Sequence, residues 1–311
     1  MNAVLGIDSS CYTSSCALMD ADMQLLASHR IPIKVDPGER GLRQSEAVFA
    51  HLTQLPLALK VLMSQAQADI AAVCVTSRPS DREDSYMPVF KAGAGIAESI
   101  ATVLRVPLYK TSHQRGHIAA AGLQMRDLPE QYMALHLSGG TTDLLLIDGD
   151  SLSTLSQSVD LHAGQLIDRV GVALGLPFPA GPRLEELGLR GQAAGRYASS
   201  VDREGCHLSG AETQAMRDIK QARLKAEDIA AEVFDLLSRT AYKMLGEAEA
   251  QTGVQDVLVF GGVASSQLLR DLLIQRVRQR RSSLRVHFGK PEYSGDSAVG
   301  VAAIGARRHF A

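Results

Sequence analysis

Hydrophobic and polar residues alternate in short blocks along the first part of the chain. Three short apolar runs, at residues 4–8, 15–19 and 24–28, are separated by turn-sized gaps. Strands this short and this close together are typical of an antiparallel meander. A longer stretch, residues 45–66, has apolar residues at three- and four-residue steps, which predicts a helix. Pro56 lies inside that stretch, so we expect a kink or a break there.

The pattern then changes from a meander to alternating strands and helices. Residues 71–76 and 107–109 are predicted as strands, with a helix at residues 92–104 between them. The same order starts again further along the chain. A second meander is predicted at residues 133–137, 143–147 and 152–156. Later helices and strands are predicted at residues 165–174, 227–249, 257–260, 266–280 and 284–288. The repetition predicts a duplicated α/β fold whose two lobes enclose a cleft.

Length and composition agree with two soluble domains. The chain has 311 residues, which exceeds the size at which one hydrophobic core usually stops growing. Hydrophobic residues make up 45% and charged residues 21%, as in ordinary globular proteins. The formal net charge of -2 gives no global field that would attract nucleic acid, so such contact requires a local patch.

One basic segment could supply such a patch. Its members are Arg270, Arg276, Arg278, Arg280, Arg281 and Arg285. These side chains could contact RNA phosphates. A solvated helix face explains the same run, and it is the commoner situation.

The cysteines and the N-terminal segment indicate a compartment. Four cysteines without a CxxC pair do not make a disulfide framework, which favours a reducing environment. The first residues lack the basic and long apolar stretches of a signal peptide. The apolar run at residues 298–306 is too short to cross a bilayer. We therefore expect a soluble, cytoplasmic protein without membrane contact.

The segment His113-Gln-Arg-Gly-His117 is the sharpest candidate for metal binding. On a helix, residues four apart lie on one face, so both imidazoles could reach one cation. Two surface histidines on a helix are the simpler reading of an isolated pair. Gln114 stands where a zinc protease of the HExxH type has its glutamate, so the segment supplies no general base for peptide hydrolysis.

Two glycine-rich segments are candidates for anion binding. Ser138-Gly139-Gly140-Thr141-Thr142 lies between two predicted strands, where backbone N–H groups suit phosphate or carboxylate oxygens. Gly261-Gly262-Val263 joins a predicted strand to a helix, which also favours phosphate. Tight turns explain both segments equally well. Asp8, Asp168 and Asp296 are candidate acids, although a lone aspartate before a helix is more often a cap.

The order of these segments resembles the tRNA threonylcarbamoyladenosine synthase family, formerly labelled glycoproteases. The matching segments span nearly the whole chain in the family's order. They are Gly6-Ile-Asp8-Ser-Ser-Cys11, His113-Gln-Arg-Gly-His117, Ser138-Gly-Gly-Thr-Thr142, Ala163-Gly164-Gln-Leu-Ile-Asp168, Leu174-Gly-Leu-Pro-Phe-Pro179-Ala-Gly181-Pro182, Leu208-Ser209-Gly210, Gly261-Gly-Val263 and Pro291-Glu-Tyr-Ser-Gly-Asp296.

The resemblance implies an actin-like ATPase fold and a metal-dependent acyltransferase. One divalent metal, Fe(II) or Zn(II), would be held by His113, His117 and Asp296. Threonylcarbamoyl-AMP, or a related adenylate, would be bound by residues at the positions that match the family's pocket. These are Ser138, Gly139, Gly140, Asp168, Gly181 and Ser266.

The implied reaction is transfer of the threonylcarbamoyl group to an adenine in the tRNA anticodon loop, with AMP leaving. The resemblance also implies a complex with an actin-like paralogue and an accessory ATPase. In this arrangement residues 1–108, completed by the C-terminal helix 297–311, form the first lobe. Residues 109–296 form the second lobe and carry the metal site.

Several positions differ from the family's pattern and indicate a divergent paralogue. Tyr12 and Thr13 stand where the family has two acids, and the charged segment at residues 78–84 replaces a Gly-Pro-Gly loop. Thr141 replaces a histidine, Gln165 an acid and Ser266 an asparagine.

Three hypotheses follow. The first is a threonylcarbamoyltransferase that acts on tRNA. The second is a non-catalytic or altered-substrate subunit that binds metal or nucleotide in a related complex. The third is a sugar or small-acid kinase of the same superfamily, which fits Asp8 and the glycine loops but leaves His113 and His117 unexplained.

Overall fold

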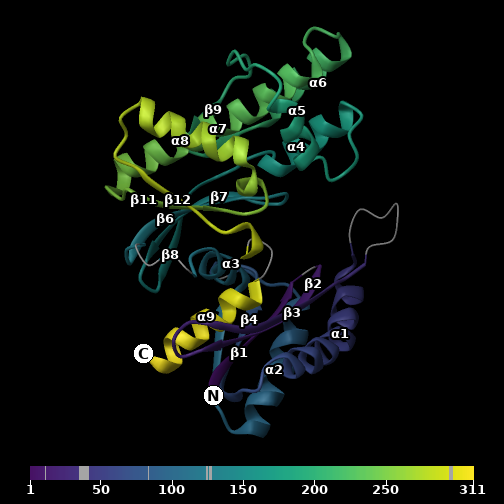
Figure 1. Cartoon of the computed structure of the whole chain (residues 1–311), viewed down its shortest axis with the longest axis vertical. Coiled ribbons are helices and arrows are strands. Elements are labelled where there is room, and N and C mark those ends of the chain that lie inside the picture. The colour runs from purple at the N-terminus through teal and green to yellow at the C-terminus, as the bar shows by residue number, and fades with distance from the viewer. Residues whose placement is uncertain (11, 35–41, 83, 124, 126–127, 294–296) are drawn as a thin grey trace. The chain divides into compact units, whose positions relative to one another are not determined.

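A computed structural model of the chain describes residues 1–10, 12–34, 42–82, 84–123, 125, 128–293 and 297–311 (Figure 1). The chain forms two compact units. The first consists of residues 1–125 and 292–311, and the second of residues 126–291. The expected boundary lay before residue 109, so the first unit is longer than expected. The segment that carries His113 and His117 consequently belongs to the first unit and not to the second.

The first unit is built on a mixed five-stranded sheet with the order β3-β2-β1-β4-β5. Its strands are β1 (Asn2–Ser10), β2 (Thr13–Asp20), β3 (Leu25–Pro32), β4 (Asp69–Arg78) and β5 (Leu108–Ser112). β1, β2 and β3 pair antiparallel, whereas β4 and β5 run parallel to β1. The predicted meander is therefore confirmed, because short strands joined by tight turns can pair only with their neighbours in this way.

Helices cover both faces of this sheet. They are α1 (Gln44–Gln65), α2 (Val89–Leu104), α3 (His113–Ala121) and α9 (Ser297–Phe310). Because side chains alternate along β1, Leu5 and Ile7 pack with α1 and α2, whereas Val4 packs with α9. α1 runs through Pro56 without the expected break.

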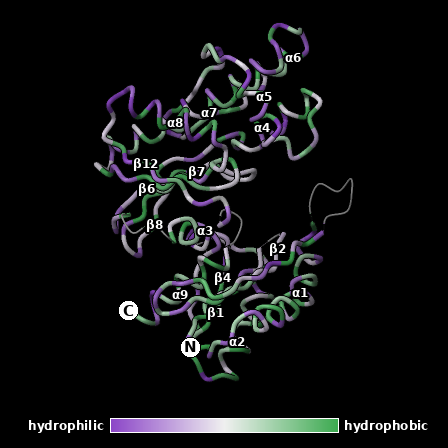
Figure 2. The backbone as a smooth tube through the Cα atoms, in the orientation of Figure 1, coloured by the Kyte–Doolittle hydropathy of each residue, from purple (hydrophilic) through white to green (hydrophobic). Residues whose placement is uncertain are grey.

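Among the described residues, α1 alone is long and apolar enough to match a membrane span. Its most apolar 18-residue window has a mean hydropathy of 1.3 and is 28% buried, and much of α1 is green in Figure 2. One such helix is weak evidence for a membrane segment. Leu55, Ala58 and Leu62 of α1 are fully buried in the core of the first unit.

The second unit repeats this architecture. Its sheet has the order β12-β11-β6-β7-β8, which matches the order of the first sheet strand for strand. The strands are β6 (Gln131–Leu137), β7 (Thr142–Asp148), β8 (Ser151–Gln157), β11 (Asp256–Phe260) and β12 (Arg285–Phe288). β6, β7 and β8 form the second meander, and β11 and β12 run parallel to β6. The predicted duplication of an α/β unit is confirmed.

The helices of the second unit surround one large core. They are α4 (Ala163–Ala173), α5 (Gly181–Gly188), α6 (Ser209–Lys220), α7 (Ala226–Thr252) and α8 (Gln267–Gln279). A small hairpin, β9 (Ser200–Asp202) and β10 (Gly205–His207), lies beside β8, and 3-10 turns occupy Val263–Ser265 and Pro291–Tyr293. The sequence pattern did not predict α5, α6 or the hairpin, since none of them contains a long apolar run.

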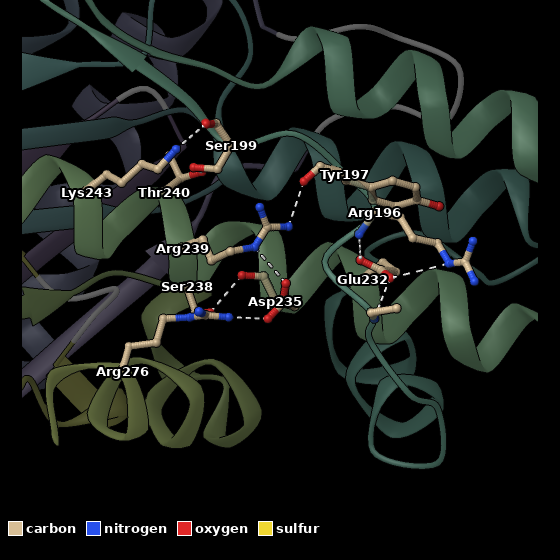
Figure 3. A network of polar contacts seen from close by, with 11 residues as sticks. Arg196, Tyr197, Ser199, Glu232, Asp235, Ser238, Arg239, Thr240, Lys243 and Arg276 are labelled. Carbon is tan, nitrogen blue, oxygen red and sulfur yellow. Dashed lines mark hydrogen bonds and ion pairs between the residues drawn. The ribbon is translucent and has the colours of Figure 1, made fainter. Parts of the chain in front are cut away.

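Charged side chains tie α7 to its neighbours (Figure 3). Asp235 of α7 accepts a hydrogen bond from Arg239 Nε at 2.8 Å and also pairs with Arg276 of α8. Arg239 donates in addition to the backbone carbonyl of Tyr197 at 2.6 Å. Glu232 accepts the backbone N–H groups of Ala194 and Arg196. These contacts fix the irregular segment before β9 onto α7.

Candidate functional site

His113 and His117 lie side by side at the start of α3. The helix begins at His113 because Ser112 caps it, accepting the backbone N–H of Arg115 at 3.3 Å. One helical turn separates the two imidazoles, and their Nε2 atoms are 3.0 Å apart. The two histidines therefore lie on one face of a helix, as expected.

Asp8 holds the other side of the His113 ring. Its Oδ1 atom is 2.9 Å from His113 Nδ1, and Asp8 itself is only 1% exposed at the end of β1. Burial lowers the pKa of His113, but the negative charge of Asp8 and the hydrogen bond to it raise it, and the net pKa lies above the ordinary value. The ring of Phe90 packs on His113, with centroids 5.7 Å apart.

Close backbone packing places α3 against α9. A Cβ atom on Gly116 would lie 3.1 Å from the carbonyl oxygen of Ser297, the first residue of α9. Likewise, a Cβ on Gly6 of β1 would lie 2.4 Å from the backbone nitrogen of Ala302. Glycine at both positions therefore allows β1, α3 and α9 to meet beside the histidine pair.

The third expected ligand, Asp296, lies outside the described residues. Within the ranges that the structure describes, no group of three or more His, Cys, Asp or Glu side chains is arranged to hold a metal ion. The two imidazoles do fit one cation, because nitrogen atoms 3.0 Å apart can both lie about 2.1 Å from a zinc ion.

The charged segment that replaces the family's Gly-Pro-Gly loop is anchored to α3. Asp81 pairs with Arg115, which lies between the two histidines in sequence, and the backbone N–H of Gln114 donates to the carbonyl of Pro79 at 2.9 Å. The substituted segment thus contacts the helix that carries the histidine pair.

A separate pocket lies within the second unit. It has a volume of about 410 Å³ and gathers residues from five parts of the sequence. Gly139, Asp168, Gly181 and Ser266, all expected from the sequence, are among its lining residues. Ser138 and Gly140 flank Gly139 in the same turn, where the backbone N–H of Ser138 donates to the carbonyl of Thr141 at 2.8 Å.

Backbone contacts shape the glycine loop of this pocket. The N–H of Gly164 donates to the carbonyl of Ser138 at 3.0 Å, and a Cβ on Gly164 would lie 2.6 Å from Gly139 Cα. Gly261, with a φ of +106°, turns the chain after β11 against the carbonyl oxygen of Leu137. These positions need glycine because the backbones touch.

The polar side chains of the pocket also form hydrogen bonds that stabilise the surrounding helices. Asp168 Oδ1 accepts the backbone N–H of Ala180 at 2.8 Å, which fixes the start of α5. Glu185 accepts the N–H of Leu268 at 2.8 Å; the sequence motifs had not singled it out. Ser266 caps α8 by accepting the N–H of Leu269 at 3.2 Å. Gln165, where the family has an acid, accepts the N–H of His162 at the start of α4.

Three of the six arginines of the expected basic patch form hydrogen bonds or ion pairs within the protein. Arg270 donates to the carbonyls of Ala264 and Gly289, and Arg276 to Asp235 and Ser238. Arg285 pairs with Asp256. Only three of the six arginines, Arg278, Arg280 and Arg281, have no such bond described, so a solvated helix face explains the run better than a phosphate-binding surface.

Solved structures share the fold of this chain. The component A of (R)-2-hydroxyglutaryl-CoA dehydratase from Acidaminococcus fermentans aligns with a TM-score of 0.61 at 14% identity, covering 99% of both chains. A ROK family glucokinase from Streptomyces griseus aligns with a TM-score of 0.58 at 14% identity, covering 98% of this chain and 99% of its own. These likenesses confirm the expected actin-like ATPase fold.

Sequence relatives identify the family. Residues 25–303 match the family described as tRNA N6-adenosine threonylcarbamoyltransferase. A protein of that name from Aromatoleum aromaticum is 30% identical over 98% of this chain and 91% of its own length. Another, from Carboxydothermus hydrogenoformans, is 29% identical over 99% and 92%. The chain therefore belongs to the tRNA N6-adenosine threonylcarbamoyltransferase family.

Proposed function

We propose that this protein transfers a threonylcarbamoyl group from threonylcarbamoyl-AMP to an adenine in the tRNA anticodon loop. The convergence of Gly139, Asp168, Gly181 and Ser266 on one pocket carries the proposal. These residues come from distant parts of the sequence, and the order of motifs alone predicts each of them to bind the adenylate.

The pocket offers groups that suit an adenylate. The N–H of Ser138 is bonded to the carbonyl of Thr141, but the N–H groups of Gly139 and Gly140 make no described backbone bond and suit phosphate oxygens. Asp168 uses one carboxylate oxygen to fix Ala180, and its other oxygen makes no bond to the described residues, so it can accept a ribose hydroxyl. In the attack on the carbamoyl carbon, the adenine amine forms the new C–N bond and gives up one proton to solvent, while the carbon–oxygen bond to the phosphate breaks and AMP departs with the electron pair.

The proposal includes a divalent metal, Fe(II) or Zn(II), held by His113, His117 and Asp296. The paired Nε2 atoms support the first two ligands. Ser297, which follows Asp296 in the chain, lies against Gly116, the residue directly before His117 on α3. When bound, such a metal would supply Lewis-acid polarisation of the reacting group.

The proposed partners are tRNA, an actin-like paralogue and an accessory ATPase. α1 leaves Phe49, Leu52 and Leu57 between 50% and 71% exposed. An apolar groove of about 540 Å³ runs between α1 and α2 in the same unit. Exposed apolar side chains and an apolar groove on the same pair of helices support a protein partner on the α1–α2 face.

A binding and transfer experiment tests the function. Metal-loaded protein is titrated calorimetrically with a non-hydrolysable threonylcarbamoyl-AMP analogue, with His113→Ala/His117→Ala as the control. Micromolar or tighter, metal-dependent binding is expected, followed by threonylcarbamoylation of unmodified tRNA detected by mass spectrometry. Binding without transfer, even with partner proteins present, would favour the non-catalytic subunit. If protein that still holds its metal does not bind the analogue, the adenylate assignment is wrong.

A further inference from the structure

Asp8 has a place in the site that neither the family match nor the pocket explains. It lies at the end of β1, is 1% exposed, and directs Oδ1 toward His113 Nδ1 at 2.9 Å. A carboxylate buried to this degree requires a partner, because an isolated buried charge is strongly unfavourable. His113 is that partner.

The contact determines which nitrogen of His113 is free to bind a cation. A carboxylate only accepts hydrogen bonds when ionised, so the proton of His113 lies on Nδ1. The lone pair then lies on Nε2, the atom that faces His117 Nε2 at 3.0 Å. A carboxylate–imidazole pair of this kind orients a metal-binding histidine and increases its basicity.

We propose that Asp8 is the positioning residue of the metal centre, holding His113 in the tautomer and orientation that its Nε2 needs to bind the metal. The inference rests on the proposed function, in which His113 and His117 are metal ligands. The kinase hypothesis relied mainly on Asp8, because in a kinase this acid would act on a bound nucleotide. A role for Asp8 at the imidazole of His113 accounts for the residue without a kinase.

The strand that carries Asp8 is held firmly on both faces. Ser9, whose side chain points to the opposite face, donates to the carbonyl of Val89 at 3.0 Å and accepts the N–H of Gly93 at 3.2 Å, both in α2. On the face of Asp8, Gly6 touches the backbone of α9. A support fixed from two sides can hold a ligand's orientation more precisely than a loop.

A graded series of variants tests the role. Asp8→Glu keeps the charge, Asp8→Asn keeps the size and an acceptor oxygen, and Asp8→Ala removes both. Zn(II) affinity is measured by competition with a chromogenic chelator, and Co(II) is added to record the visible absorption of the bound ion. Loss of an orienting partner typically lowers metal affinity about 10- to 100-fold, so we expect Asp8→Ala to bind weakest and Asp8→Glu to restore part of the affinity.

Thr76→Val is the matched control. Thr76 is fully buried on β4 and follows Val75, the residue that pairs with Ile7 of β1. Its hydroxyl has no hydrogen-bond partner among the described residues. Removing it changes a buried polar group beside Asp8 without touching His113, so both the Zn(II) affinity and the Co(II) spectrum should match those of the wild type.

The outcomes separate the two proposals. If wild type and His113→Ala bind Zn(II) equally, the proposed metal site is wrong. If His113→Ala loses affinity while Asp8→Asn and Asp8→Ala keep the wild-type value and spectrum, the role of Asp8 is overturned and the metal site stands. Circular dichroism checks folding; should Asp8→Ala not fold, the similarly sized Asp8→Leu, which has no acceptor for the Nδ1 proton, decides.

Discussion

Gly300 of α9 lies directly against Gly116 of α3. A Cβ atom on Gly300 would lie 1.8 Å from the carbonyl oxygen of Gly116 and 2.6 Å from the backbone nitrogen of Ala120. No larger residue fits between these helices without moving them. The approach of α9 to the helix that carries His113 and His117 thus depends on glycine in both partners.

Gly300→Ala should destabilise the first unit. Because the new methyl group meets backbone atoms that cannot rotate away, we expect the free energy of unfolding to fall by about 2 kcal/mol or more. Urea denaturation followed by circular dichroism measures it. Gly95→Ala in α2 is the control, since a Cβ there meets no atom within 4 Å. It should be neutral or stabilising by up to about 1 kcal/mol, and equal losses in both variants would contradict the packing argument.

Gly164→Ala should weaken adenylate binding. The added Cβ would push on Gly139 and on the carbonyl of Ser138, and so displace the glycine turn of the pocket. A displacement that costs about 1.4 kcal/mol lowers affinity about tenfold. Calorimetric titration with AMP measures it. Gly246→Ala in α7, outside the pocket and with nothing within 4 Å of its Cβ, should bind AMP like the wild type; unchanged binding by Gly164→Ala would show that AMP lies elsewhere.

Ser266 both caps α8 and lines the pocket, and two substitutions separate these roles. Ser266→Ala removes the acceptor for the N–H of Leu269 and should lower stability by about 1 kcal/mol. Ser266→Asn preserves a good cap and adds an amide at the pocket, as in the family's pattern. One further hydrogen bond of about 1 kcal/mol would raise AMP affinity roughly fivefold. Thermal unfolding and calorimetry give the two values; a Ser266→Asn variant with wild-type stability and no gain in affinity would mean that the ligand does not reach this position.

Asp235→Ala should be among the most destabilising substitutions in the second unit. It removes a carboxylate that is 9% exposed and leaves Arg239 and Arg276 facing each other without their shared partner. Breaking such a partly buried network costs about 3 kcal/mol. Asp271→Ala on the exposed side of α8 should change stability by less than about 0.5 kcal/mol. Chemical denaturation of both variants provides the comparison, and similar values would mean that Asp235 contributes no more than a surface charge.

The contribution of Asp160 should depend on pH. Partial burial raises its pKa, but hydrogen bonds from the Ser209 hydroxyl and from the N–H groups of Leu208, Leu161 and Ser209 outweigh burial and hold the pKa below its ordinary value. The stability it provides is therefore present above the unfolded pKa of about 3.9 and is lost as the pH falls through the lower pKa of the folded state.

Asp160→Asn tests this dependence at the start of α6. The variant should be about 1 kcal/mol less stable than the wild type at pH 7. Urea unfolding midpoints at pH 7, pH 5 and pH 3.5 should show the difference shrinking toward acid pH. A difference that is the same at all three values would rule out an ionised Asp160 as its source.

Local periodicity was enough to predict most elements. The two meanders, the long helix α7 and the strand before Gly261 follow from the spacing of apolar residues, which depends only on neighbours in sequence. The sequence pattern did not predict α5, α6 or the hairpin. These elements are short and of mixed polarity, and they are stabilised by their packing on α7. The candidate site residues Gly139, Asp168, Gly181 and Ser266 came from the order of motifs, and in the fold all four line one pocket.

The sequence by itself determined the α/β class, its duplication and the residues proposed for metal and adenylate binding, because these depend on local patterns and on motif order. Only the tertiary structure decided that Asp8 holds His113, that Ser266 and Asp168 line one pocket, and that residues 109–125 belong with the first unit. Each of these depends on contacts between distant segments: the carboxylate at the end of β1 reaches α3, and Gly116 and Gly300 let α3 and α9 touch. Such contacts are made by close packing, which no linear pattern encodes.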